Sequence, residues 1–151
     1  MKRFRFPLRP VAVLRAHQET RAREAFASAV HRYVQSEEEL ARTRVRMRAL
    51  EAELFSGREK KFSAGQAALL LSDYRRECAS EAEVERQMIA AREQMQQRRT
   101  DYVEAHRKLE VVHRLEGKAR ATHRRELDRE EQAEFDDFAG RRRLKPFFAS
   151  P

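Results

Sequence analysis

The chain has 151 residues, of which 38% are charged and 40% are hydrophobic, with only four glycines, four prolines and no tryptophan. This length suits one structural unit, and the composition provides poor material for a globular core. It is instead typical of long helices, which bury one narrow apolar stripe on a partner helix. The formal charge of +8 favours acidic partners, nucleic acid or anionic membrane surfaces without choosing among them.

The first ten residues resemble the start of a signal peptide, but Arg9, Pro10 and Arg15 interrupt the apolar run. We therefore expect neither cleavage nor export. No stretch approaches the roughly 20 apolar residues that span a bilayer. The single cysteine, Cys78, has no second cysteine with which to form an internal disulfide. These features predict a protein of a bacterial-type cytosol.

The first predicted element is a helix over about 10–56, because no proline occurs between Val11 and Lys145. Apolar residues recur in it every seven residues, and mostly small residues fall midway between them. That spacing is a coiled-coil seam. The first set is Phe26, Tyr33, Leu40, Met47 and Leu54, and the second is Ala22, Ala29, Ser36, Thr43 and Leu50.

A loop is expected over about 57–66, where two glycines and two serines bracket a basic run. Ser63 is placed to cap the following helix. Phe55 and Phe62 flank this segment, and they either plug the turn or stand ready to bind a partner.

The second predicted helix covers about 67–140 and carries its own heptad seam, which Glu77, Glu81 and Arg98 interrupt. A turn centred near residue 61 then pairs the two helices antiparallel. The expected neighbours are Leu54 with Leu70, Leu40 with Val84, Phe26 with Met95, and Leu14 with Leu109 and Val112. The predicted fold class is therefore all-α, with two long helices forming an antiparallel coiled-coil hairpin whose second helix is longer.

The greater length of the second helix leaves everything after about Glu116 without a partner, over roughly 35 Å at 1.5 Å per residue. A polar helix of that length is marginal in water, so a binding partner is expected to order it. Gly140 marks its end, and a basic flexible tail covers 141–151. The whole of 1–151 is thus expected to form a single coiled-coil domain.

Catalytic chemistry finds no support in the motifs. The sequence contains no phosphate-binding glycine loop, no nucleophile elbow, no zinc-protease motif and no paired cysteines. His106 and His113 lie one heptad apart, which is too far along a helix to share a metal. Cys78 is more simply a residue at the edge of the seam than a nucleophile. We expect no enzyme activity, no cofactor and no metal.

Aromatic residues concentrate where the predicted rod ends. Of nine phenylalanines only Phe26 falls in the regular seam. Exposed aromatics interleaved with arginines are residue types that anchor protein interfaces, which favours docking over local packing for the terminal group. That group is Phe4, Phe6, Phe135, Phe138, Phe147 and Phe148.

Three segments together resemble the FliJ family of flagellar export proteins. They are the opening from Phe4 to Leu8 with Val11, Leu14 and Arg15, the glycine-broken hairpin near residue 60, and the ending from Glu134 to Ala139. The resemblance implies a small non-enzymatic cytosolic stalk of the type III export apparatus. Family members insert the terminal end of the coiled coil into a hexameric export ATPase, and they contact the cytosolic domain of the membrane export gate and export chaperones.

The resemblance also implies binding residues. Gate contacts in the family flank the hairpin, nearest here to Leu54, Leu70 and Tyr74, although Glu77 and Glu81 replace expected apolar residues. At the open end, arginines are expected to meet acidic pore loops, and two phenylalanines to pack at the ring mouth. These candidates are Arg5, Arg9, Arg124, Arg125, Phe135 and Phe138. Membrane association is expected to be peripheral and to occur through these partners.

Two alternatives remain open. A nucleic-acid or anionic-membrane binder would act through Lys2, Arg3, Arg5, Arg9 and the cluster from Arg141 to Lys145, with binding that falls steeply as salt rises. Because acidic and basic residues alternate through most of the chain, solvated faces are favoured over a nucleic-acid stripe, and no nucleic acid is expected. The other alternative is the equivalent stalk of a non-flagellar injection system.

Overall fold

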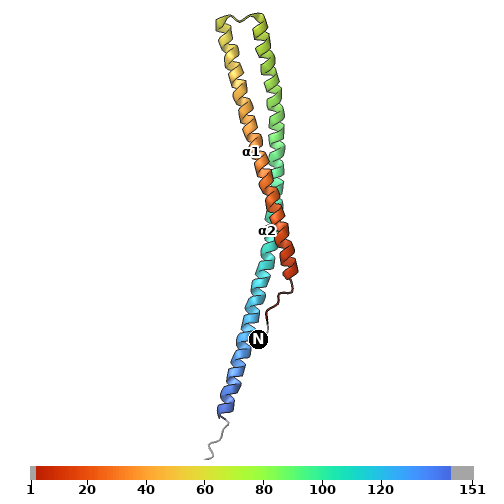
Figure 1. Ribbon diagram of the computed structural model, residues 1–151, viewed down its shortest axis with the longest axis vertical. Helices are drawn as coiled ribbons and strands as arrows, with labels where there is room; N and C mark the ends of the chain where they lie inside the picture. Colours follow the sequence, from red (N-terminus) through yellow and green to blue (C-terminus); the bar gives the residue numbers. More distant parts are fainter. Residues whose placement is uncertain (1–2, 144–151) are drawn as a thin grey trace, which may run out of the picture. The chain divides into compact units, whose positions relative to one another are not determined.

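Two long helices make up the fold, as a computed structural model that describes residues 3–143 shows (Figure 1). Helix α1 covers Arg9–Lys60 and helix α2 covers Ala64–Arg143. The predicted all-α hairpin with a longer second helix is confirmed. By their contacts the residues form two compact units. Unit 1 takes the residues up to His17 and those from His106 onward, and unit 2 covers Gln18–Ala105.

Helix α1 begins at Arg9, just after Pro7. The carbonyl of Leu8 accepts a hydrogen bond from the Ala12 N–H at 2.9 Å, and the Arg9 N–H donates to the Phe6 carbonyl at 3.2 Å. Pro10 lies in the first turn, where its missing N–H would have no partner within the helix. The proline therefore does not interrupt the helix and supports its start.

The turn between the helices is shorter than the expected 57–66 loop. Ser56 and Gly57 remain helical, and only residues 61–63 connect α1 to α2. The Phe62 N–H donates to the Gly57 carbonyl at 3.3 Å, and Lys61 adopts a left-handed φ of 52°. This is the Schellman arrangement that ends many helices, here with lysine in the position that glycine usually takes. The glycine signal was misread because Gly57 serves another purpose within the helix.

Gly57 provides space for the ring of Phe62. A Cβ atom at position 57 would lie 1.8 Å from Cε2 of Phe62, which is far inside van der Waals contact. Phe62 thus covers the last turn of α1, as expected for a residue that plugs the hairpin. The absence of a side chain at Gly57 allows this close packing, while the backbone at Gly57 stays helical.

Ser63 caps α2, as predicted. The Gln66 N–H donates to the Ser63 hydroxyl, and the Ser63 N–H donates to the Gln66 side-chain carbonyl, both at 3.3 Å. This reciprocal pair is a capping box, which satisfies two backbone donors that a helix start leaves open. It explains why α2 begins at Ala64, three residues before the expected start.

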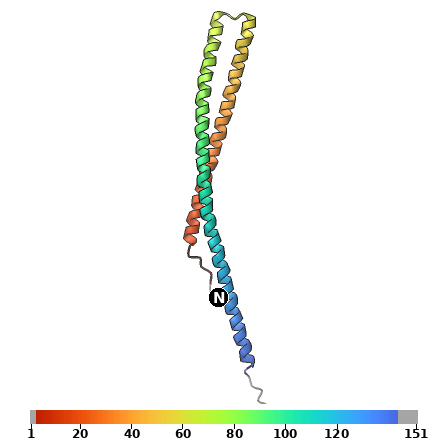
Figure 2. The same ribbon diagram turned by 180° about the vertical axis from the view of Figure 1, so that it is seen from behind.

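In unit 2 the two helices lie side by side and run antiparallel, as Figure 2 shows from behind. Burial along α1 follows the predicted heptads, since residues of both predicted sets are buried or half-buried while most positions between them are exposed. Ala29, Leu40 and Thr43 are the buried residues among these positions. The narrow apolar stripe therefore provides the core of this unit.

The ring stacking of Phe26 adds a contact to the predicted register of the hairpin. Phe26 stacks on Tyr102, with ring centroids 6.1 Å apart, one heptad beyond the predicted neighbour Met95. Side chains lean toward the N-terminus of their helix. In an antiparallel pair this lean carries an α1 side chain away from the turn and an α2 side chain toward it. Two residues that touch across the hairpin are consequently not at the same distance from the turn: the α2 residue lies farther from it than the α1 residue does.

Two polar side chains are buried in the α1 seam of unit 2. Glu19 is only 2% exposed, and its two carboxylate oxygens accept hydrogen bonds of 2.7 and 2.8 Å from Nη2 of Arg23. The Thr43 hydroxyl donates to the Glu39 carbonyl at 3.0 Å. Across the described residues, no buried side-chain nitrogen or oxygen lacks a partner. These hydrogen bonds reduce the cost of polar groups within a narrow core.

In unit 1 the N-terminal segment packs against α2 over a stretch expected to be bare. The ring of Phe4 lies 5.5 Å from that of His123, and the guanidinium of Arg120 lies 5.5 Å from the Phe4 ring centroid. The expectation that α2 is uncovered from about Glu116 is therefore wrong as far as His123. It overlooked that residues 3–8 precede α1 and can reach along the second helix.

Candidate binding surfaces

The two glutamates that interrupt the α2 heptads are paired with arginines of α1. Nε of Arg46 lies 3.3 Å from Oε2 of Glu77, and Nε of Arg44 lies 2.8 Å from Oε1 of Glu81. Arg44 also approaches Glu85 at 3.7 Å. The departure from an apolar seam is therefore compensated by interhelical ion pairs, which hold the register with polar contacts where apolar contact is lost.

The predicted gate residues Leu54, Leu70 and Tyr74 are half-buried at seam positions. The Tyr74 hydroxyl donates to Oε1 of Glu51 at 2.7 Å. This hydrogen bond, aided by Cys78, raises the pKa of Tyr74 to about 12. Each of these side chains is therefore partly packed inside the hairpin and partly exposed to a partner. The sequence could not show how much of each side chain is exposed.

More exposed apolar side chains stand beside these residues and form what we term the turn surface, comprising Phe55, Phe62, Leu69 and Leu71. Phe55 is 70% exposed and Leu69 is 68% exposed, so Phe55 does not plug the turn. A groove of about 420 Å³ opens among Leu54, Gly57, Phe62 and Leu71. Exposed apolar groups around a groove are a common feature of protein docking sites.

Basic residues border the turn surface. Arg58 and Lys61 line the groove, and Lys60 ends α1. None of the three forms an ion pair with another described residue, and α2 has no acidic residue in its first turn. The surface therefore combines apolar anchors with positive charge, which suits a partner that presents apolar and acidic side chains together.

In unit 1, Arg5 and Arg9 line a second groove of about 360 Å³. Phe4, Phe6, Glu116 and Arg120 form other parts of its wall. Phe4 and Phe6 are half-buried, so the protein itself covers part of each of these two rings that were predicted to dock. Arg5 and Arg9 remain exposed and give this groove a positively charged border.

The other predicted ring-binding residues occur farther along α2. Arg124 and Arg125 are exposed, Phe135 is 71% exposed and Phe138 is 62% exposed. The two phenylalanines share one helix face because they are three residues apart. Phe135 lies about 28 Å along the helix from Glu116 of the groove, at 1.5 Å per residue. The six predicted residues therefore do not form one pocket, and every side chain described from Asp128 to Arg141 is exposed.

Lys2, the residues from Leu144 to Lys145, Phe147 and Phe148, all named in the sequence analysis, lie outside the described residues. Within the described part, no cluster of three or more His, Cys, Asp or Glu side chains could hold a metal ion. No helix among the same residues has the length and apolar character needed to cross a bilayer.

Comparison with known families gives one match across nearly the whole chain. The family model described as Flagellar FliJ protein matches residues 4–146. No curated protein and no solved structure matches the sequence. The match spans both units and both groups of surface residues described above.

Proposed function

The chain belongs to the FliJ family of flagellar proteins, and from this premise we propose that it is a non-catalytic stalk of flagellar type III protein export. In this role it binds the hexameric export ATPase through unit 1, and it links the ATPase to the cytosolic domain of the export gate and to export chaperones. It works in the cytoplasm, at the inner face of the plasma membrane, through these partners.

The exposure of Phe135 and Phe138 carries the proposal for the ATPase end. Side chains of this size are usually covered, and here they project from a helix segment whose described neighbours are all exposed. Aromatic anchors flanked by arginines are typical of interfaces in which charge guides the encounter and the rings provide the burial. Arg124 and Arg125 precede the pair on α2, and Arg5 and Arg9 provide further positive charge in unit 1.

The turn end of unit 2 is the proposed gate-binding end. Leu54, Leu70 and Tyr74 keep this role, joined by the more exposed Phe55, Leu69 and Leu71. The basic rim of Arg58, Lys60 and Lys61 supports an acidic partner here. The loss of apolar character at Glu77 and Glu81 limits this surface to the part of the hairpin nearest the turn.

ATP hydrolysis and ring assembly by the export ATPase of the same organism test the proposal, with this chain added at near-equal stoichiometry. We expect the wild-type chain to stimulate both, and the double variant Phe135→Ala, Phe138→Ala to lose the stimulation. Phe55→Ala is the matched control, because Phe55 is equally exposed but belongs to the turn surface. It should keep the stimulation and lose binding to the gate domain.

The two ends therefore give opposite results in the two assays. If the wild-type chain bound neither ATPase nor gate domain and instead bound DNA or anionic vesicles at physiological salt, the charge-driven alternative would replace the stalk role. The match to a flagellar family favours a flagellar stalk over that of a non-flagellar injection system.

A further inference from the structure

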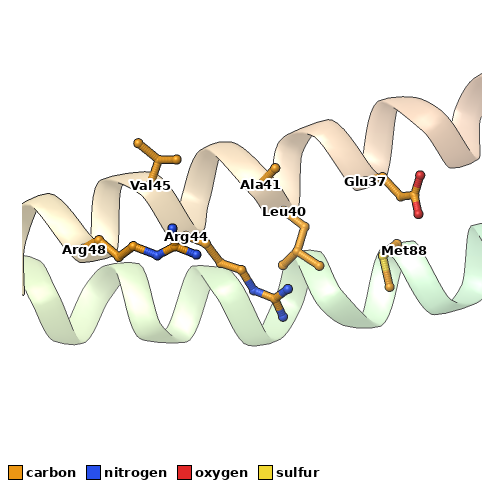
Figure 3. A pocket seen from close by; sticks show the side chains of 7 residues that line it. All are labelled: Glu37, Leu40, Ala41, Arg44, Val45, Arg48 and Met88. Carbon is orange, nitrogen blue, oxygen red and sulfur yellow. The ribbon is translucent and has the colours of Figure 1, made fainter.

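A shallow groove runs along one side of the hairpin in unit 2, away from the turn surface. It measures about 410 Å³, and Figure 3 shows the seven side chains that line it. Leu40 points toward α2, the helix that carries Met88, whereas Val45 projects away from α2. Val45 is 63% exposed, so the groove offers apolar surface that the hairpin itself does not cover.

The groove belongs to a longer apolar stripe on α1. Starting from Ala27, successive members follow after seven, seven, four, seven and three residues, and each of them is exposed. This is the spacing of a coiled-coil seam, outside the seam that packs on α2. Ala27, Val34, Ala41 and Phe55 each follow a seam residue directly, whereas Val45 and Ala52 lie midway between two seam residues and face away from α2. The members of this outer stripe are Ala27, Val34, Ala41, Val45, Ala52 and Phe55, of which Phe55 also belongs to the turn surface.

Helix α2 contributes Met88 to the groove. Its next residue, Ile89, is an exposed apolar side chain of the same helix turn. A chain in which 38% of residues are charged has ample polar residues to place on an outer face, so a second apolar seam there requires an explanation. A third helix lying along the groove would contact Ala41, Val45 and Met88, which line it, as a third chain does in three-stranded helical assemblies.

Charges around the groove define the partner further. Arg48 lines it, and Arg75 and Arg92 lie on the face of Ile89, fourteen residues before and three after it. These three arginines form no ion pair with another described residue. Among the nearby carboxylates, Glu85 pairs with Arg44. Glu37, which also lines the groove, accepts a hydrogen bond from the Tyr33 hydroxyl and keeps its negative charge. Glu93, four residues after Ile89, is exposed and forms no ion pair with another described residue.

We propose that this groove binds an amphipathic helix of a partner protein, with apolar residues at heptad spacing and acidic residues beside them. The acidic side chains would neutralise Arg48, Arg75 and Arg92 while the apolar face covers the outer stripe. A second copy of this chain fits less well, because like arginines would face one another in a pair of chains that each carry +8. The inference does not rest on the proposed stalk role.

A synthetic helix of about four heptads tests the proposal, with leucine at the seam positions and glutamate beside them. Binding of the fluorescently labelled peptide to the full chain is measured by anisotropy. We expect saturable binding that weakens at least tenfold in Val45→Glu. Val13→Glu is the matched control, because Val13 is an equally exposed valine of α1 outside the stripe and outside unit 2. It should bind as the wild-type chain does.

Charge is tested with a second peptide, in which lysine replaces each glutamate. It should bind at least tenfold more weakly than the acidic peptide, and Arg48→Glu combined with Arg75→Glu should remove most of the difference. Circular dichroism of each variant confirms that the hairpin is retained. Absence of peptide binding, or equal losses in Val45→Glu and Val13→Glu, would overturn the proposal.

Two further outcomes would assign the groove to another occupant and so reject the proposal. One is self-association of the wild-type chain in sedimentation experiments that Val45→Glu abolishes. The other is binding to vesicles of anionic phospholipid that is lost in Val45→Glu and kept in Val13→Glu. ATPase stimulation by Val45→Glu is measured in parallel and should equal that of the wild-type chain. A result that rejects helix binding in the groove is then distinguishable from one that rejects the stalk role.

Discussion

Arg44 of α1 donates a hydrogen bond from Nε to Oε1 of Glu81 on α2, with the two atoms 2.8 Å apart. The bond connects the two helices through residues that are 37 positions apart in sequence. The hydrogen bond to Glu81 raises the pKa of the Arg44 guanidinium, a group that is charged throughout the accessible pH range even without this partner. The contact fixes the register where the α2 seam carries a carboxylate instead of an apolar side chain.

Reversing this pair tests the register. Arg44→Glu places a carboxylate near Glu81 and Glu85, so the thermal midpoint of the hairpin should fall, and fall more at low salt because exposed charges are screened by salt. The double variant Arg44→Glu, Glu81→Arg should recover most of the loss. Arg42→Glu with Glu81→Arg is the control, because Arg42 pairs within α1 with Glu39. If Glu81→Arg restored the thermal midpoint of Arg42→Glu as well as it restores that of Arg44→Glu, the observed pairing of Arg44 with Glu81 would be contradicted.

Lys61 occupies a backbone conformation that favours glycine. Its φ of 52° lies in the left-handed region, where a Cβ atom meets the neighbouring carbonyl. Lys61→Gly should therefore stabilise the hairpin by about 0.5–1 kcal/mol, after the greater freedom of glycine in the unfolded chain is counted. Chemical denaturation followed by circular dichroism measures the change. The same substitution at the helical neighbour Lys60 should destabilise, and the reverse order would exclude the Schellman turn.

Gly57 should not tolerate even a methyl group. A new Cβ would displace the ring of Phe62, so Gly57→Ala should destabilise the turn by about 1–3 kcal/mol although alanine favours helix. Gly117→Ala is the control, because a Cβ there meets nothing within 4 Å. That variant should instead stabilise α2 by about 0.5–1 kcal/mol. Matching effects at both sites would show that Phe62 does not pack on Gly57 in solution.

The heptad spacing was sufficient to predict the helices, their antiparallel pairing and the buried face of α1. It could not predict that Glu77 and Glu81 form ion pairs with arginines of α1, because these pairs depend on how α1 and α2 are aligned along each other. Gly57 was misread because a glycine signals a turn in sequence but here makes room for a ring. The outer stripe was visible in the spacing of Val34, Ala41 and Val45, but its exposure becomes evident only once α2 occupies the neighbouring face.

Tyr74 offers a test by pH. The hydrogen bond to Glu51, followed by the influence of Cys78, raises its pKa from the ordinary value of 10.0 to about 12. The folded chain thus holds this proton more tightly than the unfolded chain does. The stability that Tyr74 provides is fully present below pH 10.0 and is lost as pH rises through about 12.

Ultraviolet titration of the tyrosines, with Tyr74→Phe subtracted, isolates this group. Glu51→Gln should move the titration of Tyr74 back toward its ordinary range, because a neutral amide no longer opposes the phenolate. Glu53→Gln serves as the control, since Glu53 is not among the groups that shift Tyr74. An unchanged titration in Glu51→Gln would show that the hydrogen bond does not persist in solution.

Leu40 tests the seam itself against the outer stripe beside it. It is 5% exposed, so Leu40→Asp would bury a carboxylate and remove apolar contact with α2, at a cost of at least about 3 kcal/mol. Val45→Asp makes a comparable change five residues on, where the side chain is 63% exposed, and it should alter stability by less than about 0.5 kcal/mol. Thermal unfolding followed by circular dichroism compares the two. A larger loss in Val45→Asp would mean that the outer stripe, and not the predicted seam, holds α1 against α2.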